Sequence, residues 1–311
     1  MTHHAQVRVP ASTTNLGAGF DCVGMAIDRW LTASVTLGGA TDARVSLERG
    51  GTLSSLAHAA EDDLLYRGFA AACATRKRPV PRGLQLSVTS DIPVARGLGS
   101  SAAALVAGAR LADAVLGLAL SREELATLCA RIEGHADNVA AATFGGAVLV
   151  VPQQDSGLPY VYTLLDVHPS VGFAFAVPEF EITTAAARAV LPDVMSHADA
   201  VQAAGKSAAL VRGLAVAHPR LLEIALDDVL HVPHRRGLVT GYDDVVEAAR
   251  GAGAYGATLS GSGSTLVAIG PRDAMARVAD AMRARWAEHG MRADTMVIAG
   301  PSAAAWEDDR H

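Results

Sequence analysis

The chain has 311 residues, 50% of them apolar and only 19% charged, so its length predicts two domains or one large domain with an easily filled core. The 26 lysines and arginines against 32 aspartates and glutamates leave a net charge of −6, which argues against a nucleic-acid or anionic-membrane partner, because both need a basic protein surface. Three dispersed cysteines without a Cys-x-x-Cys pair argue against a disulfide framework, and without an apolar signal segment near the N-terminus we expect a cytoplasmic protein.

Apolar periodicity predicts several strands and a long helix in the first half of the chain. Alternating apolar residues indicate strands at 7–9, 31–37 and 84–88. A helix of small residues is expected from Ala102 to Leu118, in a window that contains charged residues and is therefore a poor membrane span.

Two helix signals follow this segment. Ser121 and Glu124 have the spacing of a capping box that begins the next helix. That helix is expected to end at the Gly-His-Ala-Asp-Asn stretch, where Asp137 can cap a short turn before a strand that ends near residue 152.

The second half mixes strands and helices less regularly. The segment 152–160, rich in glycine, proline and polar residues, predicts a boundary between domains 1–155 and 156–311. The elements expected after it are a strand at 171–178, helices at about 184–190, 196–216 and 220–230, a strand-turn-strand over 256–270 and a helix at 272–289. Because strands and helices do not alternate strictly, an α+β fold is favoured over a doubly wound parallel sheet.

The sharpest chemical feature is the glycine-rich segment Pro93–Ala102, which lies between a predicted strand and a predicted helix. Gly97 and Gly99 allow the backbone N–H groups to come close to a ligand. The helix start adds unpaired N–H groups and a partial positive charge, so the segment suits a phosphate. Ser100 and Ser101 add hydroxyl groups. A plain glycine turn before a helix is the alternative interpretation.

Other phosphate and metal motifs are poorly matched. Gly205-Lys206-Ser207 lacks the first glycine of a Walker A loop, since Ala200 stands there, and no strand is predicted before it. No credible Gly-x-Gly-x-x-Gly occurs, so a Rossmann dinucleotide site is not expected. His231 and His234 flank a proline, but no third and fourth zinc ligand accompanies them.

Three ordered motifs together resemble the GHMP kinase superfamily. Residues 93–103 resemble its phosphate loop, residues 10–21 (PASTTNLGAGFD) its first motif, and residues 256–263 (GATLSGSG) its third. Within the superfamily, four stretches are typical of homoserine kinases: Asn15–Asp21, EGHADN at 133–138, Thr184 with Arg188, and HVPHR at 231–235. The resemblance spans residues 7 to about 270. It implies a two-domain α+β fold, with an N-terminal domain like domain 2 of ribosomal protein S5 and a ferredoxin-like C-terminal domain.

The resemblance also implies an activity. It suggests an ATP- and Mg²⁺-dependent enzyme that phosphorylates the side-chain hydroxyl of L-homoserine to O-phospho-L-homoserine in threonine biosynthesis, with ATP between the domains. It further suggests a homodimer. The alternatives are a GHMP kinase acting on another small alcohol, of mevalonate or shikimate type, and a non-catalytic GHMP-fold ligand sensor. A sensor is disfavoured because Glu133 and the serine pair persist.

The resemblance assigns roles to particular residues. The nucleotide-binding set is Pro93, Arg96, Gly97, Leu98, Gly99, Ser100, Ser101, Ala102 and Asp63. The Mg²⁺ set is Ser100, Ser101 and Glu133. The acceptor-binding set is Asn15, Asp21, His135, Asn138, Thr184, Arg188, Arg235 and Gly261. Asp137, Asn138 and Arg188 form the catalytic set, in which Asp137 and Asn138 orient the hydroxyl without full proton abstraction.

Asp21 suits the ammonium or the hydroxyl group of the acceptor, and the planar guanidinium groups of Arg188 and Arg235 suit a carboxylate. The chain departs from the family pattern at three positions. Ser264 replaces the usual proline of the third motif, and Thr240 stands where an LIPG-like sequence is common. Asp63 stands where the family commonly has asparagine near the nucleotide base, and a carboxylate cannot donate to a ring nitrogen.

Overall fold

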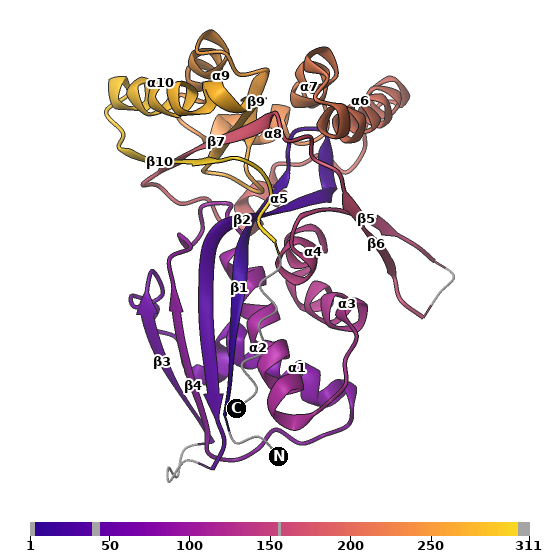
Figure 1. Cartoon of the computed structure of the whole chain (residues 1–311), viewed down its shortest axis with the longest axis vertical. Coiled ribbons are helices and arrows are strands. Elements are labelled where there is room, and N and C mark those ends of the chain that lie inside the picture. Colours follow the sequence, from indigo (N-terminus) through magenta and orange to yellow (C-terminus); the bar gives the residue numbers. More distant parts are fainter. Residues whose placement is uncertain (1–3, 39–43, 155–156, 304–311) are drawn as a thin grey trace.

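Two β-sheets organise the chain in the computed structural model, which describes residues 4–38, 44–154 and 157–303 (Figure 1). The strands of the first sheet are β1 (His4–Asn15), β2 (Gly19–Thr36), β3 (Val45–Gly51), β4 (Leu84–Ser90), β5 (Ala147–Pro152) and β6 (Tyr160–Leu165). Their order is β3-β4-β2-β5-β6, with β1 paired to β2. Only β3 and β4 run parallel to each other.

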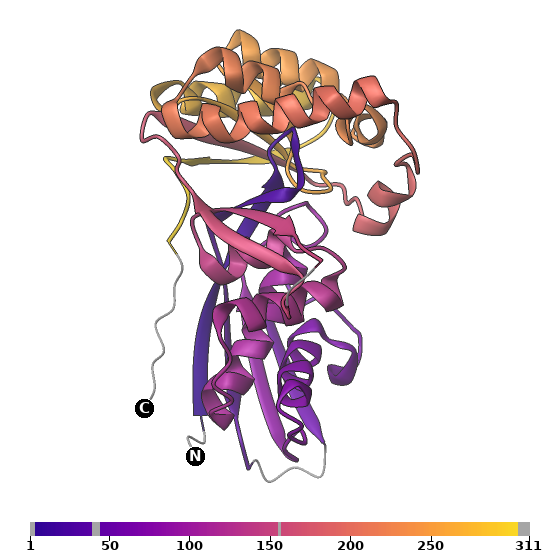
Figure 2. The ribbon, with the colours of Figure 1, turned by 90° about the vertical axis from the view of Figure 1, so that its right-hand side faces the viewer.

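Helices cover one face of this first sheet (Figures 1 and 2). They are α1 (Leu64–Thr75), α2 (Ser100–Leu116), α3 (Arg122–Glu133) and α4 (Asp137–Phe144). Two glycines let α1 and α2 cross closely: a Cβ on Gly68 would lie 2.2 Å from the Leu105 carbonyl oxygen, and one on Gly108 would lie 1.8 Å from that of Leu65. This close crossing requires small residues in α2, and ten of its 17 residues are alanine, glycine or serine.

The second sheet has the order β10-β7-β9-β8, with every neighbouring pair antiparallel. Its strands are β7 (Val171–Pro178), β8 (Gly256–Leu259), β9 (Leu266–Pro271) and β10 (Ala293–Ile298). The helices of this half are α5 (Thr184–Ala189), α6 (His197–Val216), α7 (Pro219–Leu226), α8 (Val232–Arg235), α9 (Tyr242–Gly251) and α10 (Met275–Glu288). The strand order 4-1-3-2 is that of a ferredoxin-like sheet, so the expected two-part α+β fold is confirmed.

The β1–β2 hairpin joins the two halves of the molecule (Figure 2). Its tip lies against α7: Ala18 N donates to the Ala225 carbonyl oxygen at 3.0 Å, and Leu16 is fully buried. A Cβ on Gly17 would lie 2.5 Å from the same Ala225 oxygen. The close contact at the tip therefore places the residues beside it, Asn15 and Asp21, at the junction between the two halves.

The structure differs from the sequence prediction around residue 155. The predicted boundary falls on residues 155–156, which lie outside the described part of the chain, in the connection between β5 and β6. Those two strands pair with each other, and Gln153 N donates to the Pro159 carbonyl oxygen at 2.9 Å. The turn-rich composition of 152–160 therefore belongs to a hairpin, and the first sheet continues to Leu165.

Several local predictions can be compared with the elements directly. The capping box is confirmed, since Glu124 N donates to Ser121 Oγ at 3.1 Å and Ser121 N donates to Glu124 Oε2 at 2.8 Å. Asp137 does not cap a turn: it is the first residue of α4, with Ala136 at the N-cap. α7 ends at Leu226 rather than near 230, and the sequence analysis predicts none of α1, β3, β6, α8, α9 and β10. No helix within the described residues is long and apolar enough to cross a membrane.

Candidate active site

A cavity of about 300 Å³ lies between the two halves of the molecule, and residues from all three glycine-rich motifs line it. One end is largely apolar and is lined by Leu53, Leu56, Leu64, Leu65 and Val88. The other end carries the polar side chains of Asp21, Glu133, His135, Asp137, Asn138, Arg188 and Arg235. The segment Pro93–Ser101 lies along the same cavity, so most of the predicted site residues are gathered in one place.

Direct backbone contacts hold the three motifs together. Gly97 has φ +71°, and a Cβ there would lie 2.1 Å from the Ser260 carbonyl oxygen. Gly261 N donates to the Thr14 carbonyl oxygen at 3.1 Å, and Asn15 Nδ2 donates to the Gly261 carbonyl oxygen at 2.9 Å. Gly261, predicted to bind substrate, therefore links the first motif to the third through its backbone.

The phosphate loop ends in a helix N-terminus that no side chain caps. Gly99 is the N-cap of α2 in the left-handed conformation, with φ +70°. The first turn of α2 therefore presents N–H groups, and the N-terminal end of the helix dipole, to the cavity. Leu98 is anchored below, where its carbonyl oxygen accepts from Ser12 N at 3.1 Å, and Ala102 is fully buried. Gly99, Leu98 and Ala102 have no polar side-chain atoms, so they can offer an anion only backbone N–H groups, which suit a phosphate.

Arg96 lines the cavity, but its guanidinium group is engaged elsewhere. Its Nε donates to the Pro178 carbonyl oxygen at 2.9 Å, and its Nη1 lies 3.1 Å from Glu181 Oε1. Both partners belong to the second half of the chain. The Arg96 side chain therefore anchors the loop to the other half of the molecule, and the loop presents no free cationic side chain of its own.

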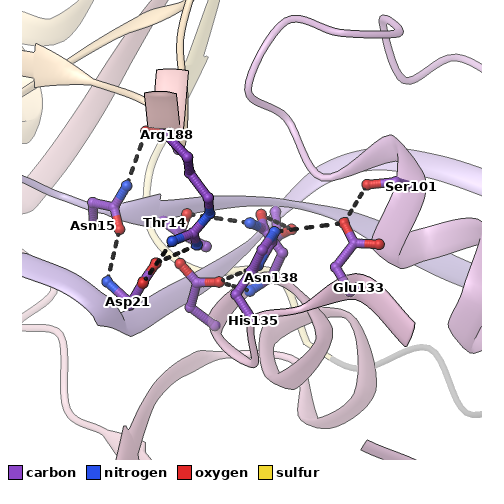
Figure 3. A network of polar contacts seen from close by, with 11 residues as sticks. Thr14, Asn15, Asp21, Ser101, Glu133, His135, Asn138 and Arg188 are labelled. Carbon is purple, nitrogen blue, oxygen red and sulfur yellow. Dashed lines mark hydrogen bonds and ion pairs between the residues drawn. The ribbon is translucent and has the colours of Figure 1, made fainter. Parts of the chain in front are cut away.

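Carboxylate groups flank an imidazole beside the start of α2 (Figure 3). Ser101 Oγ donates to Glu133 Oε1. His135 lies between two acids, with Nδ1 2.9 Å from Asp137 Oδ1 and Nε2 3.8 Å from Glu133 Oε1. Burial alone would lower the pKa of His135, but the hydrogen bond to Asp137 and the charges of Asp137 and Glu133 outweigh it, so that the pKa is raised.

Asp137 is 2% exposed and its carboxylate is well satisfied. Its Oδ1 accepts from Asn138 N at 2.8 Å in addition to contacting His135. Burial would raise the pKa of Asp137, but hydrogen bonds from His135, Asn138 N and Thr14 lower it overall. The carboxylate is therefore ionised at neutral pH and is a weak base.

Asn138 is held at both ends of its amide. Its Oδ1 accepts from Ser12 Oγ at 2.8 Å, and its Nδ2 donates to Thr14 Oγ1 at 3.3 Å. Ser12 and Thr14 are buried residues of β1 that the sequence prediction did not include among the site residues. Both residues lie within the first motif, and this position could have identified them as site residues.

The acceptor end of the cavity contains an ion pair between residues that are far apart in the sequence. Arg188 Nη2 and Nη1 donate to Asp21 Oδ1 and Oδ2 at 2.8 and 3.1 Å (Figure 3). Asp21 N donates to Asn15 Oδ1 at 3.0 Å, which fixes the backbone that carries the Asp21 carboxylate. Thr184 begins α5, one turn before Arg188, and also lines the cavity; Thr183, not predicted, is the N-cap of that helix.

Arg235 is 2% exposed, yet it lines the same cavity. Its Nε donates to the Ala187 carbonyl oxygen at 2.9 Å, and its guanidinium carbon lies 5.0 Å from the ring centroid of Phe20. Burial, followed by the neighbouring charge of Arg188, lowers the pKa of Arg235. Two guanidinium groups thus face one cavity end, which favours an anionic ligand there.

The structure does not leave Asp63 free for a nucleotide base. Its Oδ1 accepts from Leu65 N at 2.9 Å, which caps α1, and its Oδ2 lies 2.8 Å from Arg49 Nε and 3.0 Å from His58 Nε2. Asp63 is 6% exposed and lines the cavity beside His58, with both of its carboxylate oxygens already in contact with protein groups.

Comparison with known proteins agrees with these observations. The family model for the GHMP kinases N terminal domain matches residues 63–146, and that for the GHMP kinases C terminal matches residues 208–288. A protein of Picosynechococcus sp. named homoserine kinase is 40% identical over 94% of this chain and 95% of its own length.

Solved structures give the same result. The crystal structure of homoserine kinase from Cytophaga hutchinsonii covers 97% of this chain with 29% identity and a TM-score of 0.85, and the match includes 96% of that chain. The structure of L. major mevalonate kinase in complex with R-mevalonate covers 96% of this chain and 97% of its own, with 17% identity and a TM-score of 0.68. The latter likeness shows the fold alone.

Proposed function

Because this chain belongs to the homoserine kinases of the GHMP kinase family, we propose that it transfers the γ-phosphoryl group of ATP to the side-chain hydroxyl of L-homoserine. The products are ADP and O-phospho-L-homoserine, an intermediate of threonine biosynthesis. The enzyme is a phosphotransferase with an alcohol as acceptor. The observation that carries the proposal is one cavity with an uncapped helix N-terminus on one side and an Asp21–Arg188–Arg235 cluster on the other.

The nucleotide fits the part of the cavity that the phosphate loop lines. Its triphosphate would lie along Pro93–Ser101, where backbone N–H groups and the start of α2 supply the positive potential. The adenine ring would lie against the apolar wall that includes Leu53, Leu56 and Val88. This placement explains how a chain with a net charge of −6 binds a polyanion without a lysine-rich surface.

The acceptor end matches the charges of an amino acid. The ammonium group of L-homoserine would pair with Asp21, and its carboxylate with Arg188 and Arg235. In the structure Asp21 and Arg188 neutralise each other. A zwitterion can replace both halves of that ion pair, whereas an alcohol that lacks the ammonium group, such as mevalonate, would leave Asp21 without a partner.

Positioning, rather than a strong base, accounts for activation of the hydroxyl. Asp137 is ionised and already accepts hydrogen bonds, so its carboxylate can orient the acceptor hydroxyl as a further donor. Asn138 is fixed by Ser12 and Thr14 and can complete the alignment. Transfer of a phosphoryl group between oxygens depends mainly on such alignment and on neutralisation of charge.

The donor set beside α2 fits Mg²⁺. Ser101 and Glu133 bring a hydroxyl and a carboxylate together, and oxygen ligands of this kind suit that ion. No group of three or more His, Cys, Asp or Glu side chains in the described ranges could hold a metal ion, so phosphates and water would supply the other ligands. Ser100, the first residue of α2, lines the cavity beside them. When bound, Mg²⁺ neutralises charge on the phosphate oxygens.

An assay of ADP release with a panel of alcohols tests the proposal. L-homoserine should be the preferred acceptor over mevalonate, shikimate and L-serine, and the product should be identified as O-phospho-L-homoserine by mass spectrometry. Turnover of mevalonate without turnover of L-homoserine would refute the proposal. Binding of ATP and L-homoserine by calorimetry without ADP release would instead indicate a ligand sensor.

The homodimer and the cytoplasmic location both stay predictions. Light scattering coupled to size exclusion would measure the oligomeric state directly, with a monomer mass of 32.0 kDa as the reference.

A further inference from the structure

His231 is fully buried beneath the acceptor end of the cavity, and the proposed reaction assigns it no role. It is the N-cap residue of the short helix α8, which ends at Arg235. Its ring stacks on Phe20 with centroids 4.9 Å apart and an interplanar angle of 19°. Its Nε2 lies 3.1 Å from the Gly17 carbonyl oxygen, and its Nδ1 lies 3.4 Å from Arg235 Nη1. The imidazole therefore connects the hairpin tip to a buried arginine.

The contacts of the imidazole determine where its proton lies. The Gly17 carbonyl oxygen can only accept a hydrogen bond, so Nε2 must carry a proton. The Arg235 guanidinium can only donate, so Nδ1 must present a lone pair. Both conditions are met by the neutral ring with its proton on Nε2. A doubly protonated ring would direct an N–H group and a positive charge at the guanidinium.

The backbone of His231 is fixed as firmly as its ring. Asp228 Oδ2 accepts from His231 N at 2.7 Å and from Val232 N at 2.8 Å, while Asp228 Oδ1 accepts from Leu230 N at 3.0 Å. These contacts hold the start of α8, so the ring is supported from both its backbone and its two nitrogens.

We propose that His231 is a positioning residue that holds the Arg235 guanidinium toward the acceptor carboxylate. Arg235 is then held at three points: its Nε on the Ala187 carbonyl oxygen, its Nη1 on His231, and its plane above Phe20. The remaining N–H groups of Arg235 have no partner among the residues that the structure describes and are available to the ligand. Gly17 and Phe20 belong to the first motif, so that motif orients an arginine over 200 residues away.

The inference rests on the proposed function, and two substitutions separate the two nitrogens. His231→Asn keeps an acceptor near Nδ1 but cannot reach Gly17, whereas His231→Gln keeps a donor near Nε2 but offers Arg235 no acceptor. We expect His231→Gln to raise the KM for L-homoserine roughly 10-fold, as loss of a hydrogen bond to a charged group does. His231→Asn should raise it about threefold or less. The kcat and the KM for ATP should change about twofold or less in both.

His234→Gln is the matched control, because His234 is an exposed histidine on the same helix. It should leave all three kinetic constants unchanged. A rise of the KM for ATP equal to that for L-homoserine in His231→Gln would indicate a merely structural role and overturn the proposal. So would equal effects of the Asn and Gln variants, since only one of them keeps the acceptor that faces Arg235.

A double-mutant cycle with Arg235→Lys tests the route of the effect. If His231 acts through Arg235, His231→Gln should lower kcat/KM for L-homoserine roughly 10-fold in the wild-type background and about twofold or less beside Arg235→Lys. Additive losses would overturn the proposal.

Nitrogen-15 NMR of the wild-type protein labelled at histidine tests the tautomer without any substitution, with His231→Asn used for assignment when that variant folds. His231 should be neutral and protonated at Nε2 at pH 7; a proton on Nδ1 would overturn the proposal. If the wild type does not phosphorylate L-homoserine, the proposed function fails, but this measurement still decides the state of His231.

Discussion

Substitution of Gly97 by alanine is expected to damage both the fold and the nucleotide site, and the structure supplies a matched control. Gly97 has φ +71°, and its added Cβ would lie 2.1 Å from the Ser260 carbonyl oxygen and 2.9 Å from Gly263 N. Gly117, at the other end of α2, has φ +60° and nothing within 4 Å of its added Cβ. The two alanine variants therefore share the conformational cost and differ in the overlap.

The magnitude follows from these two contributions. Alanine in the left-handed region costs about 1 kcal/mol at either position. At Gly97 the backbone of Ser260 must also move, and overpacking of this kind costs about 1–3 kcal/mol. The movement weakens the 2.7 Å contact between Ser260 Oγ and the Gly97 carbonyl oxygen as well. We expect a loss of about 3 kcal/mol for Gly97→Ala and about 1 kcal/mol for Gly117→Ala.

Urea unfolding followed by circular dichroism measures both free energies, and steady-state kinetics measures the KM for ATP. Gly97→Ala should raise the KM for ATP, because it moves the phosphate loop, whereas Gly117→Ala should not. Equal losses of stability in the two variants would refute the reasoning, since the overlap with Ser260 would then have no energetic consequence.

Three further outcomes are expected. Glu133→Gln keeps an acceptor for Ser101 but removes the charge, so kcat should fall roughly 100-fold with little change in the KM for L-homoserine. The Mg²⁺ concentration that gives the half-maximal rate should rise. A turnover close to that of the wild type would exclude a role of Glu133 in binding the metal. Asp63→Asn keeps the helix cap but loses the partly buried ion pair with Arg49, so the free energy of unfolding measured in urea should fall by about 1 kcal/mol while the KM for ATP stays nearly constant. A large change in that KM would mean that Asp63 contacts the nucleotide base. Burial lowers the pKa of His231 to about 4, with the charge of Asp228 opposing the shift and that of Arg235 adding to it. Between about pH 6.5 and 4 the unfolded chain therefore binds a proton at His231 that the folded chain does not bind, so the free energy of unfolding should fall as the pH drops through this range. Between pH 7.5 and 5.5 the free energy of unfolding should fall less in His231→Asn than in the wild type, and equal falls would contradict this assignment.

Local sequence predicted much of the first half of the molecule. The Ser121–Glu124 capping box lies within four residues, and its hydrogen bonds need no distant partner. The phosphate loop is similar, because Gly97 and Gly99 carry their backbone requirement in their own lack of a Cβ. The sequence analysis does not predict α1, because it assigns Asp63 to the nucleotide, whereas in the structure Asp63 is the N-cap of this helix.

The second sheet and the hairpin connection depended more on context. The turn-rich segment 152–160 has the composition of a linker and also of a hairpin loop, and only the pairing of β5 with β6 distinguishes the two. The composition of the segment predicts a turn, but the sheet that the next strand joins depends on its pairing with other strands in the folded chain.

The family resemblance, the phosphate loop and most of the predicted site residues at the cavity come from short motifs whose chemistry is local, although Thr14 and Thr183 line the cavity without having been predicted. The way in which these residues are used depends on the tertiary structure. It directs Arg96 away from the loop, gives both Asp63 oxygens to the protein, and pairs Arg188 with Asp21 across 167 positions. These partners depend on packing between segments that are distant in the chain, so a local sequence pattern does not predict which donor contacts which acceptor.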